Sequence, residues 1–425
     1  MNPVAFCTSL ALLWLGALQS EPVVAAQSGP RENPAEARSP SPLWDGLEAG
    51  PFAVGFEAEL LVDRSRSFDQ GAGTDGSDSP YAARPIRLFV WYPASIGNDD
   101  HPMVFGDYLA PTLEAGSEYS PYLDLLTARD LDTAKRQFRP SSDLLVEKLL
   151  STLTAAFQHA QPVPGRRPLL LHSLGRNDFQ QESTVLFEYL ASHGFVVATV
   201  PQIGRSVGDD RLAFESADLL VQKRDLGFAL AHLVGSDPRV DPRRIAFSGH
   251  SAGAIAMMLL AAENANVDAL IALEGSQATA EGWDLLRANS WDPVAQQVPF
   301  LDLQATGKPP AEDRVWAGMK HADRLRIVIG GRDDGLWTTH FDFQNWPLYA
   351  ILTGVEDERG QPYRSMELGR DTYLAVCSLT QRFLGSVWST STELGALEKP
   401  PQVRPDLVDV EYSPRLAPPS EIDDH

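Results

Sequence analysis

The sequence of 425 residues contains only two cysteines, which excludes a fold held together by disulfides. Cys7 lies in an N-terminal apolar segment that we expect to be removed, so Cys377 would have no partner in the mature chain. Cys377 lies in a stretch with helical spacing and is expected to be a small core residue rather than a reactive thiol. Cysteine chemistry is therefore excluded.

Positive charge is also scarce, with 35 Lys and Arg against 57 Asp and Glu and a formal net charge of -22. Such a chain repels phosphate backbones, so we expect no nucleic-acid partner. The Arg pairs at 166–167 and 243–244 are interpreted as solvated loop residues.

The apolar run at residues 4–18 is about 15 residues long and falls short of the ~20 needed to span a bilayer. Val24-Ala25-Ala26 follows it and suits a secretory cleavage site. We therefore predict a signal peptide at 1–26, a secreted or periplasmic location, and no stable membrane span in the mature chain. Because no Lys or Arg precedes the run, an uncleaved anchor is the alternative.

Four segments are expected along the chain. After the signal peptide, residues 27–45 form a disordered leader, residues 46–395 a single α/β domain, and residues 396–425 a tail rich in proline and acids. The absence of internal repeats and the interleaving of strands with helices favour one doubly wound sheet. The predicted fold class is α/β, with an eight-stranded, mostly parallel sheet flanked by helices.

Local patterns place these strands. Residues 52–62 and 86–92 are expected to open the sheet as an antiparallel pair, and residues 169–200 read as strand, helix, glycine stop and strand, which is a βαβ unit. Further strands are expected at 269–273, 299–304 and 325–330. An insertion at 94–160, before the fourth strand, holds amphipathic stretches at 122–134 and 143–160 and either covers the active-site end of the sheet or forms a surface hairpin.

The stretch Gly249-His-Ser251-Ala-Gly253 follows a strand-like run and leads into the apolar residues 254–260. This layout is typical of a nucleophile elbow, in which small residues let strand and helix approach and the serine lies on a strained turn. Ser251 is therefore the predicted nucleophile. The alternative is a glycine-rich turn with a purely structural role.

A serine hydroxyl needs an imidazole base oriented by an acid, and in this arrangement both follow the serine in the chain. Only His321, His340 and His425 do so. His321 precedes the strand at 325–330 and His425 lies in the tail, whereas His340 follows that strand after a loop. His340 is the predicted base.

The acid is less sharply specified. Glu274 directly follows the strand at 269–273 and is favoured, while Asp313 and Glu312 follow the strand at 299–304 and Asp333 and Asp334 share a loop with His340. The oxyanion hole is predicted from the N–H groups of Ala252 and Leu174. His172 precedes the serine and is expected to support the loop at 173–175.

Several stretches together resemble the platelet-activating-factor acetylhydrolase-like branch of the α/β-hydrolases, a neighbour of the dienelactone hydrolases. They are Gly50-Pro-Phe-Ala-Val-Gly55, Arg84-Pro-Ile-Arg-Leu-Phe-Val-Trp-Tyr-Pro93, Leu169-Leu-Leu-His-Ser-Leu-Gly175, Tyr189-Leu-Ala-Ser-His-Gly-Phe-Val-Val197, Asp241-Pro-Arg-Arg-Ile-Ala-Phe-Ser-Gly-His-Ser251 and Thr339-His-Phe-Asp342. The resemblance covers residues 48–390 and implies an acid after the strand that follows the nucleophile, as Glu274 is, although aspartate is usual there. His172-Ser173 replaces the usual His-Gly, and Ala254 replaces a second glycine.

The predicted function is an exported serine hydrolase that cleaves carboxylic esters, short-chain or phospholipid-type, through an acyl-enzyme. Its expected partner is a small-molecule ester or lipid, and no cofactor or metal is expected. Two alternatives remain open: an exported peptidase or acyltransferase with the same triad, and a non-catalytic binding protein of the same fold.

Overall fold

The computed structural model describes residues 41–68, 83–111, 119–137, 143–206, 211–306, 313–330, 338–353, 366–389 and 408–416. The predicted signal peptide lies outside these ranges. The strands are β1 (Ala53–Asp63), β2 (Arg84–Ser95), β3 (Ala156–Gln158), β4 (Gln161–Pro162), β5 (Arg167–Ser173), β6 (Val196–Thr199), β7 (Val240–His250), β8 (Ala269–Leu273), β9 (Phe300–Ala305), β10 (Arg324–Ile329) and β11 (Val408–Ser413). The α-helices are α1 (Ser120–Gln137), α2 (Asp143–Leu150), α3 (Thr184–Ser192), α4 (Ser216–Ser236), α5 (Ala252–Ala261), α6 (Ala280–Ala288), α7 (Arg314–Gly318), α8 (Trp346–Thr353) and α9 (Met366–Val387).

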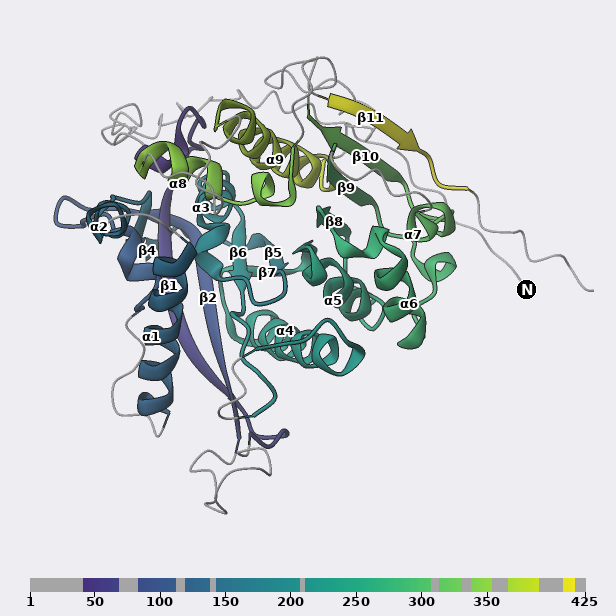
Figure 1. Cartoon of the computed structure of the whole chain (residues 1–425), viewed down its shortest axis with the longest axis horizontal. Helices are drawn as coiled ribbons and strands as arrows, with labels where there is room; N and C mark the ends of the chain where they lie inside the picture. Colours follow the sequence, from purple (N-terminus) through teal and green to yellow (C-terminus); the bar gives the residue numbers. More distant parts are fainter. Residues whose placement is uncertain are drawn as a thin grey trace, which may run out of the picture. The chain divides into compact units, whose positions relative to one another are not determined.

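The strands form one mixed sheet in the order β11-β10-β9-β8-β7-β5-β6-β2-β1-β3, with β4 beside β2 (Figure 1). From β10 to β6 every neighbouring pair is parallel. The predicted antiparallel pair is confirmed by β1 and β2, and the predicted βαβ unit by β5, α3 and β6. The α/β fold class with a mostly parallel central sheet is therefore confirmed.

Helices cover both faces of the sheet because its central strands are apolar on both sides. In β5, Leu170 packs into the core beneath α3, α8 and α9, whereas Leu169 and Leu171 pack into the core beneath α4, α5, α6 and α7. Figure 1 shows these two groups of helices on opposite sides of the strands. Burial on both faces explains why the strands read as continuous hydrophobic runs.

Three strands and one helix end were not predicted. Two of the strands, β3 and β4, lie around the end of the insertion, and β11 pairs with β10 inside the predicted tail. The amphipathic stretch predicted at 143–160 is helical only as far as Leu150. There the hydroxyls of Ser151 and Thr152 donate to the carbonyls of Glu147 and Lys148, at 2.8 and 2.7 Å. Such local bonds compete with a continuing helix.

The predicted leader is also structured at its end. Residues Pro42–Trp44 form a short 3-10 helix, η1, in which Leu43 and Trp44 are buried. The indole of Trp44 donates to the buried carboxylate of Glu188 on α3, at 2.7 Å. This contact fastens the start of the described chain to the core.

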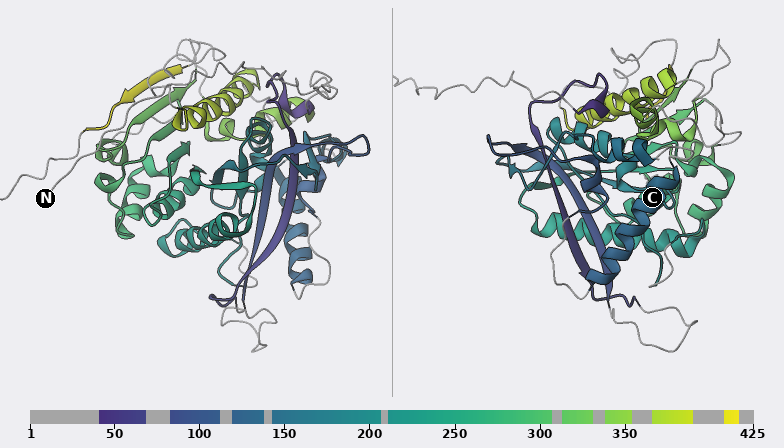
Figure 2. Two further views of the ribbon diagram at one scale, coloured as in Figure 1. Left: turned by 180° about the vertical axis from the view of Figure 1, so that it is seen from behind. Right: turned by 60° about the vertical axis from the view of Figure 1, so that its left-hand side comes forward.

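Within the insertion, α1 is held by a buried charge. The Asp130 carboxylate accepts from Arg87 on β2 at 3.0 Å and from Arg129 at 2.9 Å. Figure 2 shows α1 running along the long β1–β2 pair, where Tyr122 and Leu126 pack with Phe68. The Arg129 guanidinium also lies 5.9 Å from the Phe179 ring centroid. Because Phe179 lies in the loop after β5, α1 contacts the carboxyl end of the parallel strands.

Candidate active site

Ser251 lies at the junction of β7 and α5, at the carboxyl end of the central parallel strands. Its backbone angles are φ 53° and ψ −124°, which lie in the positive-φ half of the Ramachandran map that residues other than glycine rarely occupy. The turn is held by hydrogen bonds from the Ser251 N–H to the Leu273 carbonyl at 3.2 Å and from the Ser276 N–H to the Ser251 carbonyl at 2.9 Å. The predicted elbow geometry is therefore present, with a half-buried hydroxyl.

The two glycines around Ser251 are required by close approach. A Cβ on Gly249 would lie 2.5 Å from the amide nitrogen of Ala254, and a Cβ on Gly253 would lie 2.1 Å from the carbonyl oxygen of Ser173. Real Cβ atoms do not approach backbone this closely, so larger residues would force strand, helix and the loop after β5 apart. These contacts fix the start of α5 against β5.

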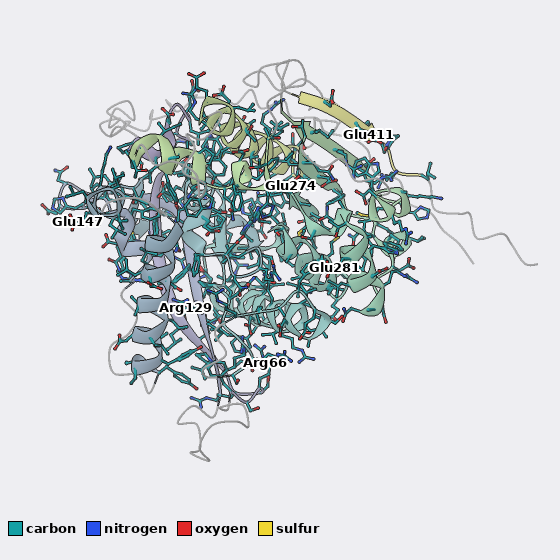
Figure 3. All side chains as sticks on the ribbon, viewed as in Figure 1. Arg66, Arg129, Glu147, Glu274, Glu281 and Glu411 are labelled. Atoms are coloured by element: carbon teal, nitrogen blue, oxygen red, sulfur yellow. The ribbon has the colours of Figure 1, made fainter. Side chains whose placement is uncertain are left out.

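Glu274 follows β8 directly and also has a left-handed backbone, with φ 46°. One carboxylate oxygen accepts a hydrogen bond from the Ala305 N–H at 2.8 Å, which anchors the side chain to the end of β9. The other oxygen lies 4.0 Å from Nδ1 of His340. In Figure 3 Glu274 lies near the centre of the view, whereas Glu147 and Glu411 lie near its edges.

His340 begins the short 3-10 helix η6 (His340–Phe343). The Asp342 carboxylate accepts from the Thr339 N–H at 2.7 Å, which closes the turn that presents the imidazole. Because Nδ1 faces Glu274, Nε2 lies on the opposite side of the ring. The side chain is 37% exposed and can therefore meet a substrate. The ring also stacks on His250, with centroids 4.2 Å apart. This stack places His340 beside the residue that precedes Ser251.

The structure brings Ser251, His340 and Glu274 to one end of the sheet, but it assigns Asp313 to another task. One Asp313 oxygen accepts from the Trp316 N–H at 2.9 Å and caps α7, and the other is bonded to the Arg326 guanidinium. Both oxygens are thus engaged. Glu312, Asp333, Asp334 and His425 lie outside the described residues. His321, in the turn before β10, contacts the Leu416 carbonyl.

Leu174 and Ala252, the predicted oxyanion donors, lie on either side of the elbow. Ser173 pairs with Gly249 across β5 and β7, so Leu174 follows at the level of the turn. The Leu174 carbonyl accepts from Gln202 at 3.1 Å and from Gln222 at 2.6 Å. Ala252 opens α5, and the first N–H groups of a helix have no intrahelical acceptor. The Leu174 peptide is therefore held in place beside the elbow, and the Ala252 N–H has no acceptor within α5.

His172 has the supporting position expected from the sequence. It is fully buried on β5, and its Nδ1 lies 2.8 Å from the Ser248 hydroxyl on β7. Burial, and secondarily the neighbouring His250, lower the pKa of His172 to about 3. The ring is thus neutral at physiological pH and packs the strand pair below the elbow.

A polar network around His250 was missed by the sequence analysis. Nδ1 of His250 lies 2.8 Å from the carboxylate of Asp178, in the loop after β5. The Gln344 amide donates to Asp178 at 2.9 Å and to Glu182 at 2.8 Å. Restricting the search to histidines after the serine removed His250, although its place inside the elbow motif was a signal.

The described residues also bear on metal binding and on membrane insertion. No group of three or more His, Cys, Asp or Glu side chains suited to hold a metal ion occurs among the residues with assigned positions. Within those same ranges, no helix has the length and apolar character required to cross a bilayer.

Comparison with known proteins was made by sequence and by structure. No protein-family model matches the sequence, and no curated protein matches it. Among solved structures, a ferulic acid esterase from Streptomyces cinnamoneus is similar over 86% of this chain and 98% of that one, with a TM-score of 0.56 and 23% sequence identity. The similarity shows an α/β-hydrolase-like fold for this chain.

Proposed function

We propose that this protein is an exported serine hydrolase that cleaves carboxylic esters through an acyl-enzyme. One observation carries the proposal: a strained serine at the β7–α5 turn shares one end of the sheet with a histidine whose Nδ1 faces a carboxylate. The similar solved structure is named as an esterase, which supports an ester substrate. The resemblance to the acetylhydrolase-like branch supports short-chain or phospholipid-type acyl esters.

The proposed roles follow from this geometry. His340 takes the Ser251 proton on Nε2 while Ser251 Oγ attacks the ester carbonyl, and Glu274 orients the ring through Nδ1. The Leu174 and Ala252 N–H groups stabilise the tetrahedral oxyanion. His340 then protonates the departing alcohol. In the second half of the reaction His340 takes a proton from water, the water attacks the acyl-enzyme, and the acid and free Ser251 are released. The 4.0 Å between Nδ1 and the Glu274 carboxylate exceeds hydrogen-bond length, and we expect it to shorten when substrate binds.

The nucleophile is tested with the Ser251→Ala variant. We expect it to lose hydrolysis of short p-nitrophenyl esters and labelling by a fluorophosphonate probe, because the attacking oxygen is gone. Ser276→Ala is the matched control, since its hydroxyl lies 3.5 Å from that of Ser251. Labelling that persists in Ser251→Ala and disappears in Ser276→Ala would move the nucleophile. Product analysis with alcohol or amine acceptors separates a hydrolase from an acyltransferase or peptidase.

The acid is tested by comparing Glu274→Gln with Asp313→Asn. We expect Glu274→Gln to lower kcat by about 1,000-fold or more, because an amide no longer holds the imidazole in the productive tautomer. Asp313→Asn removes the charge that pairs with Arg326, while the amide oxygen can still cap α7, so we expect somewhat lower stability with turnover retained. The reverse order of kcat losses would assign the acid to Asp313.

A further inference from the structure

His250 and Asp178 form a second histidine–carboxylate pair directly against the predicted base. Nδ1 of His250 lies 2.8 Å from the Asp178 carboxylate, and the His250 ring stacks on His340 with centroids 4.2 Å apart and planes inclined by 35°. The His250 side chain is only 1% exposed. The pair therefore acts on His340 through a fixed, water-poor contact.

We propose that Asp178 and His250 form a positioning dyad that holds the His340 ring and stabilises its protonated form during catalysis. This inference rests on the proposed function. The hydrogen bond to Asp178 fixes the His250 proton on Nδ1, because a carboxylate accepts and does not donate. It also makes the ring more electron-rich, as carboxylate bonds do for metal-bound imidazoles. An electron-rich ring face then contacts the ring that carries positive charge after Ser251 loses its proton.

The tautomer agrees with the surroundings of the other ring nitrogen. His250 Nε2 is buried and has no hydrogen-bond partner among the residues whose positions are described. A proton there would be a buried donor without an acceptor, which is costly, whereas a bare lone pair costs less. The proton therefore belongs on Nδ1, toward Asp178.

The same carboxylate links three parts of the site. Gln344, four residues after His340, donates to Asp178, so the segment that carries the base is tied to the dyad. Gly175 lies against it as well, since a Cβ there would be 2.1 Å from the Asp178 carboxylate. The loop after β5, the elbow and the His340 segment are thus joined at Asp178.

Several charged and titratable groups lie around His340 and could each influence its protonation. Among the residues with described positions, Glu274 approaches from the end of β8 and His250 from the end of β7, and Asp342 lies on the same short helix. Asp178 acts through His250, and Glu182 is one bond further away through Gln344. Replacing Asp178 therefore removes the charge that is hydrogen-bonded to the stacked His250 ring.

The test measures the rate of inactivation by a fluorophosphonate probe between pH 5 and 9, which does not depend on knowing the substrate. In Asp178→Asn, the amide oxygen still accepts from His250 but the negative charge is lost. We expect the plateau rate to fall about tenfold and the acid limb to move to lower pH by about half a unit, because a proton on His340 is less stabilised. Glu182→Gln, which removes a charge from the same network, should leave the limb in place.

His250→Phe keeps a stacked ring and the Asp178 charge but removes the hydrogen bond that couples them, so its plateau rate should fall as in Asp178→Asn. The double variant should show little further loss, because both changes break one unit. An unmoved acid limb in Asp178→Asn, or an equal movement in Glu182→Gln, overturns the dyad. If His250→Phe does not fold by circular dichroism, the two carboxylate variants decide alone. Absence of Ser251 labelling in the unaltered protein would instead refute the proposed function.

Discussion

Glu188 on α3 makes the stability of this protein depend on pH in a way that can be measured. The carboxylate is buried and accepts from the Trp44 indole and the Tyr108 hydroxyl, both at 2.7 Å, and from the Ala155 N–H at 3.3 Å. Burial nevertheless dominates and raises its pKa from the ordinary 4.5 to about 7. Between pH 4.5 and about 7, Glu188 is therefore protonated in the folded chain and ionised in the unfolded chain.

Proton linkage gives the sign and size of the Glu188 contribution to the free energy of unfolding. Below pH 4.5 both states are protonated and the group has no effect on unfolding. As the pH rises to 7, the folded state binds more protons than the unfolded state, so the free energy of unfolding falls. Each pH unit between the two pKa values is worth about 1.4 kcal/mol, which gives a loss of about 3 kcal/mol by pH 7.5.

The assay compares Glu188→Gln with the unaltered protein in urea unfolding followed by circular dichroism, from pH 4.5 to 8. Glutamine imitates the protonated acid, so the two proteins should differ little at pH 4.5. The variant should become the more stable by about 3 kcal/mol at pH 7.5. Subtracting the two curves removes the contribution of other groups such as Asp302, whose pKa burial also raises to about 7. Parallel curves, with a constant difference at every pH, would refute the reasoning.

Two further predictions concern the backbone beside Ser251. Gly253→Ala places a Cβ 2.1 Å from the Ser173 carbonyl oxygen and 2.5 Å from the Leu174 carbonyl oxygen, so the loop after β5 must shift. We expect fluorophosphonate labelling to slow about 100-fold in a protein that still folds. An unchanged labelling rate would contradict the close approach. Gln222→Leu removes a 2.6 Å hydrogen bond to the Leu174 carbonyl. We expect kcat for p-nitrophenyl acetate to fall roughly five- to tenfold with KM nearly constant. A change confined to KM would argue against a role of Leu174 in the oxyanion hole.

The sequence was most informative where burial dominates. The strands from β5 to β9 are buried on both faces, so their apolar runs predict them directly. The missed strands β3 and β4 have only three and two residues. In β11, Val408-Asp-Val-Glu-Tyr-Ser413 alternates as an edge strand should, but the neighbouring prolines and acids favoured a disordered reading. Short and edge strands depend on their neighbours, which local patterns do not contain.

The site divides in the same way. Ser251, His340 and Glu274 were found because chain order and strand ends are properties of the sequence, and the roles assigned to them stay predictions. The network of Asp178, His250 and Gln344 joins residues up to 166 positions apart, and no local pattern pairs them. The Asp313 alternative stayed open from the sequence, because its engagement with Arg326 depends on how β10 packs beside α7.

The antiparallel pairing of β11 with β10 has a consequence for handling the protein. All six residues of β10 pair with β11, and the Trp316 indole donates to Glu411 across the join at 3.1 Å. A chain ended before residue 408 would present the free backbone groups of β10, a strand with three fully buried apolar side chains, to other molecules. Exposed strand edges of this kind pair between molecules and lead to self-association. β11 thus covers the edge of the sheet at β10. We expect that removing it, for example to aid crystallisation, reduces solubility even if the candidate active site remains intact.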